Sequence, residues 1–514
     1  MRLTGCVSKC SSLILALLFW GRSGAVAGDA LPPAAEYHSA GMGRLIGNSN
    51  LATLNKMLAL PSAAPVRKLV FDKFSWWVAN SFQLGTNGTS ALLAPLLNDV
   101  TRSESAGCFG GATTNPPGFV VAFRLEEART RFWKDSLDKA FGQPGESFQA
   151  GDFPGTRWER GSNSFWMIPA KGWLVIGRGD DLSRSRDGYL EQLRQHERPA
   201  PPLQDKWLEA DLDWSKLAAW LPDWSRLFKP AHVQISVTPE KDNLRLTARV
   251  VYPGPVEWHA PAGSPPVELV RNPIVSFTAG QDVGAFLNLD STFSRLDASP
   301  LTNQFFAWAL NQMPLQTYTA WPAANASNAL ETFSTEAMAG FNLRLNQFNH
   351  TAWQWRNNPR RLVLLDLRVM SPTLEAERDA TGEYLVLSMF PRMPGGQPAP
   401  DALWKAIAGR TNLVYYDWES TGSRLQEWRL LGSILASGSA VSSDDVFTAK
   451  VTEDKWLGDL RDVAGRTVTE ITRVAPDELS VVRDAPVGLT GIEIFMLSNW
   501  LSAIGSSPVN PVAH

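Results

Sequence analysis

Residues 232–251 alternate between apolar and polar side chains with a period of two on both sides of a turn. The apolar positions are Val233, Ile235 and Val237 before the turn and Leu244, Leu246, Ala248 and Val250 after it. Successive side chains of a strand point to opposite faces, so the pattern predicts an antiparallel hairpin with one packed and one wet face. The rest of the chain must therefore supply elements that cover the packed face.

The residues before this hairpin supply both helices and further strands. Residues 125–141 carry apolar side chains at helical spacing and are followed by Gly142 and Pro144, which predicts a helix that stops there. The run GFVVAF at 118–123 is typical of a buried strand, and SFWMIP and GWLVIG at 164–177 predict a hairpin. Two further helices are expected near 51–60 and 187–196.

The second half of the chain repeats this order. GEYLVLSMFP (382–391) stands where GWLVIG stood, a helix near 401–408 follows, and 411–428 takes the place of 206–220. Both of the latter segments place an apolar strand before an Asp-Trp pair, Asp213-Trp214 and Asp417-Trp418, and a hairpin with Pro and an acid at its bend follows each. We interpret the repetition as an internal duplication, with chance similarity of two halves as the alternative.

Together these patterns predict an α+β fold of two related units, each a mostly antiparallel sheet packed with amphipathic helices. The predicted boundaries are a signal peptide at 1–27, an N-terminal lead-in at 28–65, a first unit at 66–252, a linker with six prolines at 253–273, a second unit at 274–503 and a flexible tail at 504–514.

The N-terminus has the pattern of a secretory signal peptide. Arg2 and Lys9 precede the apolar run at 13–20, and small residues at 25–27 suit a signal peptidase. We therefore expect an exported protein, periplasmic or extracellular, with an uncleaved anchor as the alternative. The run is shorter than the ~20 residues that span a bilayer, and no transmembrane span is expected in the mature chain.

Charge and cysteine content exclude several classes of partner and ligand. Residues 1–27 hold three basic residues and no acid, so 45 basic and 51 acidic residues remain, a net charge of −6. With no basic stripe, no nucleic-acid partner is expected. Cys108 is the single mature cysteine and the six histidines are scattered, so we expect neither a disulfide nor a metal site, and no cofactor.

No motif points to catalysis, because a nucleophile elbow, a Walker loop and a His-Glu-x-x-His helix are all missing from the sequence. One aromatic pair stands out. Trp353 and Trp355 would face the same side of an extended segment, among hydrogen-bonding residues such as Arg356. Trp353, Trp355 and Arg356 are therefore the candidate binding residues, as a platform on which a sugar ring could stack. The alternative is a strand whose two rings cover the core.

Residues 207–224 hold four tryptophans, which could likewise form a ligand surface or pack in the core. Leu217, Trp220, Leu221 and Trp224 fall on one helical face, so we interpret these rings as packing.

With its signal peptide, its repeated units and runs such as Phe119–Ala128, the chain resembles large secreted bacterial proteins built from repeated α+β units without a catalytic signature. The resemblance covers most of the mature chain and supplies no residue with a known role. It implies a secreted or periplasmic protein with a non-enzymatic binding or scaffold role in the cell envelope. Two alternatives stay open: a glycan-binding or glycan-acting protein that meets polysaccharide through the Trp353/Trp355 pair, and a carrier of apolar ligands in a groove lined by the inner faces of two sheets.

Overall fold

The computed structural model describes residues 33–502 except 85–88, 111–117, 162, 180–181, 218–229, 260–263, 287–303, 312–314, 338–352, 358–359, 365–370, 391–394 and 437–453. The predicted signal peptide, the tail, and Trp220 and Trp224 lie outside the described residues.

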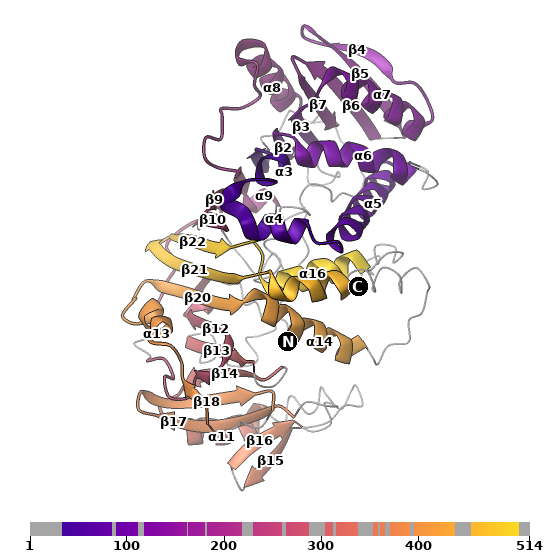
Figure 1. Cartoon of the computed structure of the whole chain (residues 1–514). Coiled ribbons are helices and arrows are strands. Elements are labelled where there is room, and N and C mark those ends of the chain that lie inside the picture. Colours follow the sequence, from indigo (N-terminus) through magenta and orange to yellow (C-terminus); the bar gives the residue numbers. More distant parts are fainter. Residues whose placement is uncertain are drawn as a thin grey trace.

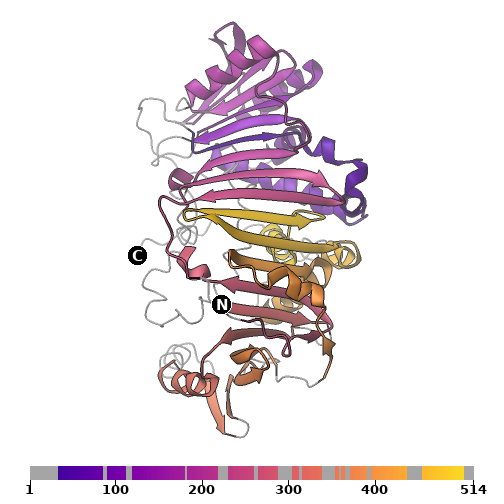
Figure 2. The same cartoon turned by 90° about the vertical axis from the view of Figure 1, so that its left-hand side faces the viewer.

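In the part of the chain that the structure describes, twenty strands form one continuous antiparallel sheet, whose strands follow one another along the long axis of the molecule (Figures 1 and 2). The first half of the chain contributes β1 (Ala35–Ser39), β2 (Ser105–Gly110), β3 (Gly118–Arg124), β4 (Glu146–Ala150), β5 (Phe153–Arg160), β6 (Asn163–Ala170), β7 (Trp173–Arg178), β8 (Leu208–Asp213), β9 (His232–Glu240) and β10 (Asn243–Val251). The second half contributes β12 (Ile274–Gln281), β13 (Gln304–Leu310), β14 (Thr317–Pro322), β15 (Trp353–Asn357), β16 (Arg360–Leu364), β17 (Thr373–Asp379), β18 (Gly382–Ser388), β20 (Leu413–Ser420), β21 (Arg466–Ala475) and β22 (Glu478–Ala485). A separate small ladder pairs β11 (Arg271–Asn272) with β19 (Gln397–Pro398).

The two halves of the sheet share one strand order. From the centre outward the first half runs β10, β9, β8, β1, β2, β3, β7, β6, β5, β4. The second runs β22, β21, β20, β12, β13, β14, β18, β17, β16, β15, in which each strand holds the place of its counterpart. The halves meet where β10 pairs with β22, from Leu244 opposite Ala485 to Val251 opposite Glu478. The predicted α+β class is confirmed, and the two predicted sheets are joined edge to edge.

Helices cover both faces of this sheet (Figure 1). One face, called the inner face below, carries α4 (Ala52–Leu58), α5 (Ala63–Ser81), α6 (Thr89–Arg102), α7 (Glu127–Phe141), α11 (Ala326–Thr332), α14 (Thr421–Ala436) and α16 (Gly491–Ser502). The outer face carries α8 (Ser183–His196) and α13 (Asp401–Ile407). The remaining short helices are α3 (Met42–Leu45), η1 (Ser49–Leu51), α9 (Trp214–Leu217), η3 (Val283–Phe286), η4 (Phe333–Ala337) and η5 (Leu460–Asp462).

The strand period explains this division. On β3, Val121 and Phe123 belong to the inner core with α7, whereas Val120 and Ala122 belong to the outer core with α8. A strand that is buried on both faces reads as a continuous apolar run, as GFVVAF does.

Most predicted elements of the repeat are present. The helix expected at 125–141 is α7, which ends at Gly142 with φ 73°, a conformation that glycine adopts without strain. The hairpin 232–251 is β9–β10, and its counterpart is β21–β22. The stretch expected as a lead-in holds α4, near the predicted helix, and also β1, which lies between β2 and β8 in the sheet.

The two Asp-Trp pairs are not equivalent in the fold, although their strands are. Asp213 is the last residue of β8, whereas Asp417 lies within β20, whose last residue is Ser420. The short sequence match is therefore offset by three positions. Trp214 is buried, and its Nε1 has no hydrogen-bond partner among the described residues. Trp207 is half-buried, and its Nε1 donates to the Gly41 carbonyl at 3.0 Å. Packing is thus confirmed for these two rings.

Candidate functional site: an apolar cavity on the inner face

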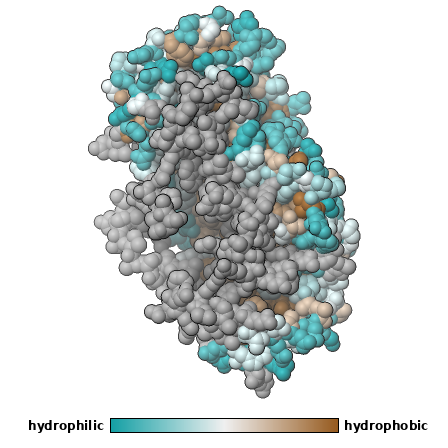
Figure 3. Space-filling model, turned by 180° about the vertical axis from the view of Figure 1, so that it is seen from behind, coloured by the Kyte–Doolittle hydropathy of each residue, from teal (hydrophilic) through white to brown (hydrophobic). Residues whose placement is uncertain are grey.

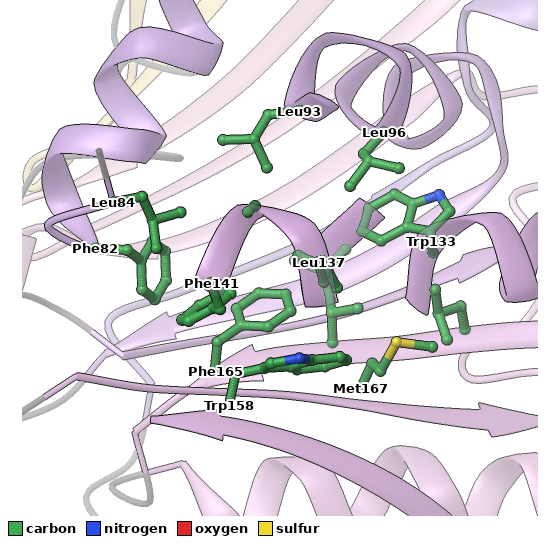
Figure 4. Close-up of a cluster of buried hydrophobic side chains, with 14 of the residues drawn as sticks. Phe82, Leu84, Leu93, Leu96, Trp133, Leu137, Phe141, Trp158, Phe165 and Met167 are labelled. Atoms are coloured by element: carbon green, nitrogen blue, oxygen red, sulfur yellow. The ribbon is translucent and has the colours of Figure 1, made fainter. Parts of the chain in front are cut away.

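A cavity of about 520 Å³ lies between the inner face of the first half of the sheet and the helices above it. This volume is within the range of roughly 300–1,000 Å³ that small-molecule sites occupy. Its walls come from β1, β2, β3, β6 and β7 below, from α4, α5, α6 and α7 above, and from α16 at the side. Figure 4 shows part of the adjoining core, where Phe82, Phe141, Phe165 and Trp133 lie between the helices and the strands.

The floor of the cavity follows from strand alternation. Phe109, Phe119, Val121 and Ile176 sit on neighbouring strands and in register, so their side chains share the inner face. Tyr37 joins them because its partner Gly107 has no side chain: a Cβ at Gly107 would lie 2.6 Å from Cε1 of the tyrosine ring.

The roof is dominated by α5, whose sequence AAPVRKLVFDKFSWWVANS is apolar on more than one side. Val70, Phe71, Phe74 and Trp77 line the cavity and are only half-buried, because open space lies next to them. An amphipathic surface helix would bury its apolar side chains in close contact with the sheet. Here the helix is held away from the strands, and an apolar space remains.

The helices of the roof are tied to one another by polar groups outside the cavity. Asp99 on α6 accepts hydrogen bonds from Trp133 Nε1 at 3.0 Å and from Arg129 Nη2 at 2.6 Å, both on α7. Indole nitrogens usually find such a partner when their rings are buried. These hydrogen bonds fix α6 against α7, and the ring of Trp133 faces the cavity.

The side wall is contributed by the second half of the chain. Ile494, Leu497 and Leu501 on α16 line the cavity together with Trp456 and Leu460. At the far end of α16, Trp500 lies 5.3 Å from Phe74 between ring centroids, and Lys73 Nζ lies 4.8 Å from the same indole. The cavity therefore needs both halves of the molecule for its walls.

Few polar groups reach this cavity, and most of them are satisfied nearby. The Oγ of Ser81 donates to the Trp77 carbonyl at 3.0 Å, and Oγ1 of Thr101 donates to the Asn98 carbonyl at 3.0 Å. Burial raises the pKa of Tyr37 to about 12, so its hydroxyl stays neutral at physiological pH. Two cations complete the lining: the exposed Arg67 and the half-buried Arg178.

The inner face of the second half is polar beside α16, on β20 and β22. Arg483 on β22 forms a buried ion pair with Glu493 on α16, with Nη1 at 2.9 Å from Oε2. Glu419 on β20 accepts a hydrogen bond from the backbone N–H of Gly491, at the start of α16, at 2.6 Å. Burial is the main cause that raises the pKa of Glu419 to about 7, with the neighbouring Asp417 charge second, and burial also raises the pKa of Asp417. This polar cluster holds the N-terminus of the helix whose other residues wall the cavity.

The residues predicted as a stacking platform lie far along the sheet, on its last strand β15. Trp355 is half-buried and packs against the cluster of Leu330, Leu362 and Leu374, whereas Arg356 is exposed. The side chain of Trp353 lies outside what the structure describes. The platform therefore stays a prediction, and the contacts of Trp355 fit the alternative in which the ring covers core.

Sequence reasoning missed the cavity. The available signal was α5, a helix of 19 residues in which Val70, Phe71, Phe74, Trp77 and Val78 spread over more of its surface than one stripe needs. A helix that is apolar on more than one side is either buried on all sides or borders a further apolar surface, such as the wall of a cavity.

Comparisons with known proteins supply no family. No protein-family model matches the chain, and no curated protein matches it significantly. One solved structure, of TP0453 in its crystal form III, matches with a TM-score of 0.25 and 10% sequence identity, over 46% of this chain and 84% of that chain. A likeness at this TM-score carries no argument about this protein. Among the described residues, no helix is both long and apolar enough to cross a bilayer, and no three His, Cys, Asp or Glu side chains gather to hold a metal ion.

Proposed function

We propose that the protein binds an apolar ligand in the cavity under α5, as a non-enzymatic binding or carrier protein. The observation that carries the proposal is the cavity itself: about 520 Å³ of space with an almost wholly apolar lining from five strands and five helices. Large apolar pockets with a few convergent polar groups are the usual form of small-ligand sites. This proposal is a form of the carrier alternative. The site lies between one half of a single sheet and its helices, and not in a groove between two sheets.

Burial of the ligand's apolar surface would supply the free energy of binding. Each methylene group that leaves water for the cavity contributes about 0.8 kcal/mol. The half-buried side chains of α5 that line the space, such as Val70 and Phe74, would lose contact with water at the same time.

Two sequence predictions remain part of this proposal without a test. Export rests on residues 1–27, which lie outside the described residues, and it would place the binding protein in the periplasm or outside the cell. The common strand order of the two halves fits an origin by duplication, which the sequence repetition suggested first.

Binding can be tested with N-phenyl-1-naphthylamine, a neutral apolar dye that fluoresces when it leaves water. Val70→Phe fills the cavity from α5, and Val474→Phe makes the same change at a position that is 56% exposed. We expect Val70→Phe to weaken dye binding by about tenfold or more and to keep or raise the melting temperature, because filling a void adds contacts. Val474→Phe should leave both unchanged. Equal dye binding by the two variants and the parent protein would contradict the proposal.

A further inference from the structure

Among the described residues that line the cavity, Arg178 is the one half-buried cation, and it lies on the inner face of β7 two residues after Ile176. Its guanidinium lies over the ring of Phe82, 4.8 Å from the centroid. Its Nη2 donates to Asn163 Oδ1 and, at 3.5 Å, to the carbonyl of Ser81 at the end of α5. These contacts hold the guanidinium plane at the edge of the apolar space.

The residues that the structure describes offer the Arg178 guanidinium hydrogen-bond acceptors but no carboxylate. Both of its hydrogen bonds to them use Nη2. The Nε and Nη1 donors therefore have no described acceptor. Burial lowers the pKa of this guanidinium, because its charged form has lost part of its hydration. A half-buried cation gains more from an anion than a fully solvated one does.

The other cation of the lining provides a contrast. Arg67 is exposed on the first turns of α5, where water and ions solvate its charge. An anion held by Arg67 would be screened by solvent and would gain little. The half-buried site at Arg178 is the place where an anionic head group adds affinity to an apolar chain.

We propose that the ligand is a single-chain amphiphile with an anionic head, carboxylate or phosphate, whose head binds the Arg178 guanidinium while its chain fills the cavity under α5. This inference rests on the proposed function, because it assigns the ligand class of the same site. The planar guanidinium suits either head, since its paired N–H groups match two oxygens of a carboxylate or phosphate.

The experiment compares three ligands of equal chain length at pH 8 as competitors of N-phenyl-1-naphthylamine: dodecanoate, dodecyl phosphate and the neutral dodecanol. We expect each anionic ligand to displace the dye at about 10- to 100-fold lower concentration than dodecanol, because a hydrogen bond to a charged group contributes about 1.5–3 kcal/mol. In Arg178→Gln this preference should vanish while dodecanol binding stays the same. Arg67→Gln is the matched control and should keep the preference.

The outcomes separate this inference from the function beneath it. If dodecanol competes as well as dodecanoate in the parent protein, the anionic head is wrong and the apolar site stands. If Arg67→Gln abolishes the preference and Arg178→Gln does not, the assignment to Arg178 is wrong. Displacement by sodium phosphate alone would point to a free-anion site and overturn the amphiphile, and no dye binding at all would overturn the proposed function itself. Should Arg178→Gln fail to fold, Arg178→Lys keeps the charge without the planar fork and is expected to lose part of the preference.

Discussion

On the inner face of the sheet, β8 in the first half and β20 in the second carry different kinds of side chain at positions that correspond by register. Leu212 on β8 pairs with Val233, and Glu419 on β20 pairs with Thr467 at the equivalent place. Two residues earlier, Ala210 corresponds in the same way to Asp417. One strand order therefore supports apolar side chains on β8 and carboxylates at the corresponding positions of β20.

This difference explains how α16 can form a wall of the cavity without filling it. In the second half, Glu419 and Arg483 bind the first turn of α16 directly. Thr490 and Glu493 also form a reciprocal cap there, with the Thr490 N–H donating to Glu493 Oε2 at 2.8 Å. Anchored at this end, α16 extends over the first half, where Ile494 and Leu501 face the cavity. Polar contacts in one half thus fix a helix that borders open apolar space in the other.

The largest expected effect comes from breaking the anchor. Arg483→Met should lower the free energy of unfolding by about 3–5 kcal/mol, because it leaves Glu493 buried without its cation. Urea unfolding followed by tryptophan fluorescence measures the change, and Arg483→Met/Glu493→Gln should recover most of it. A loss below about 1 kcal/mol for the single variant would show that the pair does not anchor α16.

The second prediction places the glutamate of β20 at the corresponding position of β8. Leu212→Glu puts a carboxyl group into the apolar cluster around Phe109, Trp214 and Val233, and should destabilise the protein by about 3 kcal/mol at pH 8. Burial would raise the folded-state pKa of the new carboxyl. The deficit should therefore shrink as the pH falls through that raised pKa towards the unfolded-state value of about 4.3, below which both states are protonated. An equal loss of stability at pH 4 and pH 8 would mean that the charge of the new carboxylate is not what destabilises the protein.

A smaller effect of opposite sign is expected at Glu419, whose folded-state pKa is about 7 against an ordinary value of 4.5. Between these values the folded protein keeps a proton that the unfolded chain has released, so wild-type stability falls as the pH rises through this window. Glu419→Gln keeps an acceptor for the Gly491 N–H and has no charge to bury. It should be about 1–2 kcal/mol more stable than the wild type at pH 8 and nearly equal to it at pH 4. A variant that is less stable at pH 8 would contradict the pKa shift.

The smallest effect concerns the end of the sheet. Because Trp355 is half-buried on the last strand, Trp355→Ala should cost about 1 kcal/mol through lost packing. Retention on immobilised polysaccharide, measured beside the melting temperature, separates the two interpretations of the aromatic pair. Lost retention at an unchanged melting temperature would favour the stacking platform of Trp353, Trp355 and Arg356.

Sequence patterns predicted the repeated architecture well because it depends on local periodicity. The alternation at 232–251 gave β9–β10, and the apolar spacing at 125–141 gave α7 with its stop at Gly142. The strand β1 was missed because five residues between a long lead-in and a helix carry little pattern of their own.

The site escaped prediction for a different physical reason. Its walls come from residues more than 400 positions apart, such as Val66 on α5 and Leu501 on α16, and no local pattern records how far a helix stands from its sheet. The sequence predicted a ligand surface at Trp353 and Trp355, whereas the described contacts of Trp355 are with apolar side chains. Trp77 on α5, by contrast, lines the cavity.

The central claim is that the space under α5 holds an apolar chain with its head at Arg178. A crystal structure of the protein with 12-bromododecanoate tests it most directly, because the bromine gives an anomalous peak that marks the end of the chain. The account predicts one strong peak inside the cavity lined by Val70, Leu97 and Phe165, with the carboxylate at the Arg178 guanidinium. Peaks confined to the outer surface, or a cavity closed by the protein's own side chains, would contradict it.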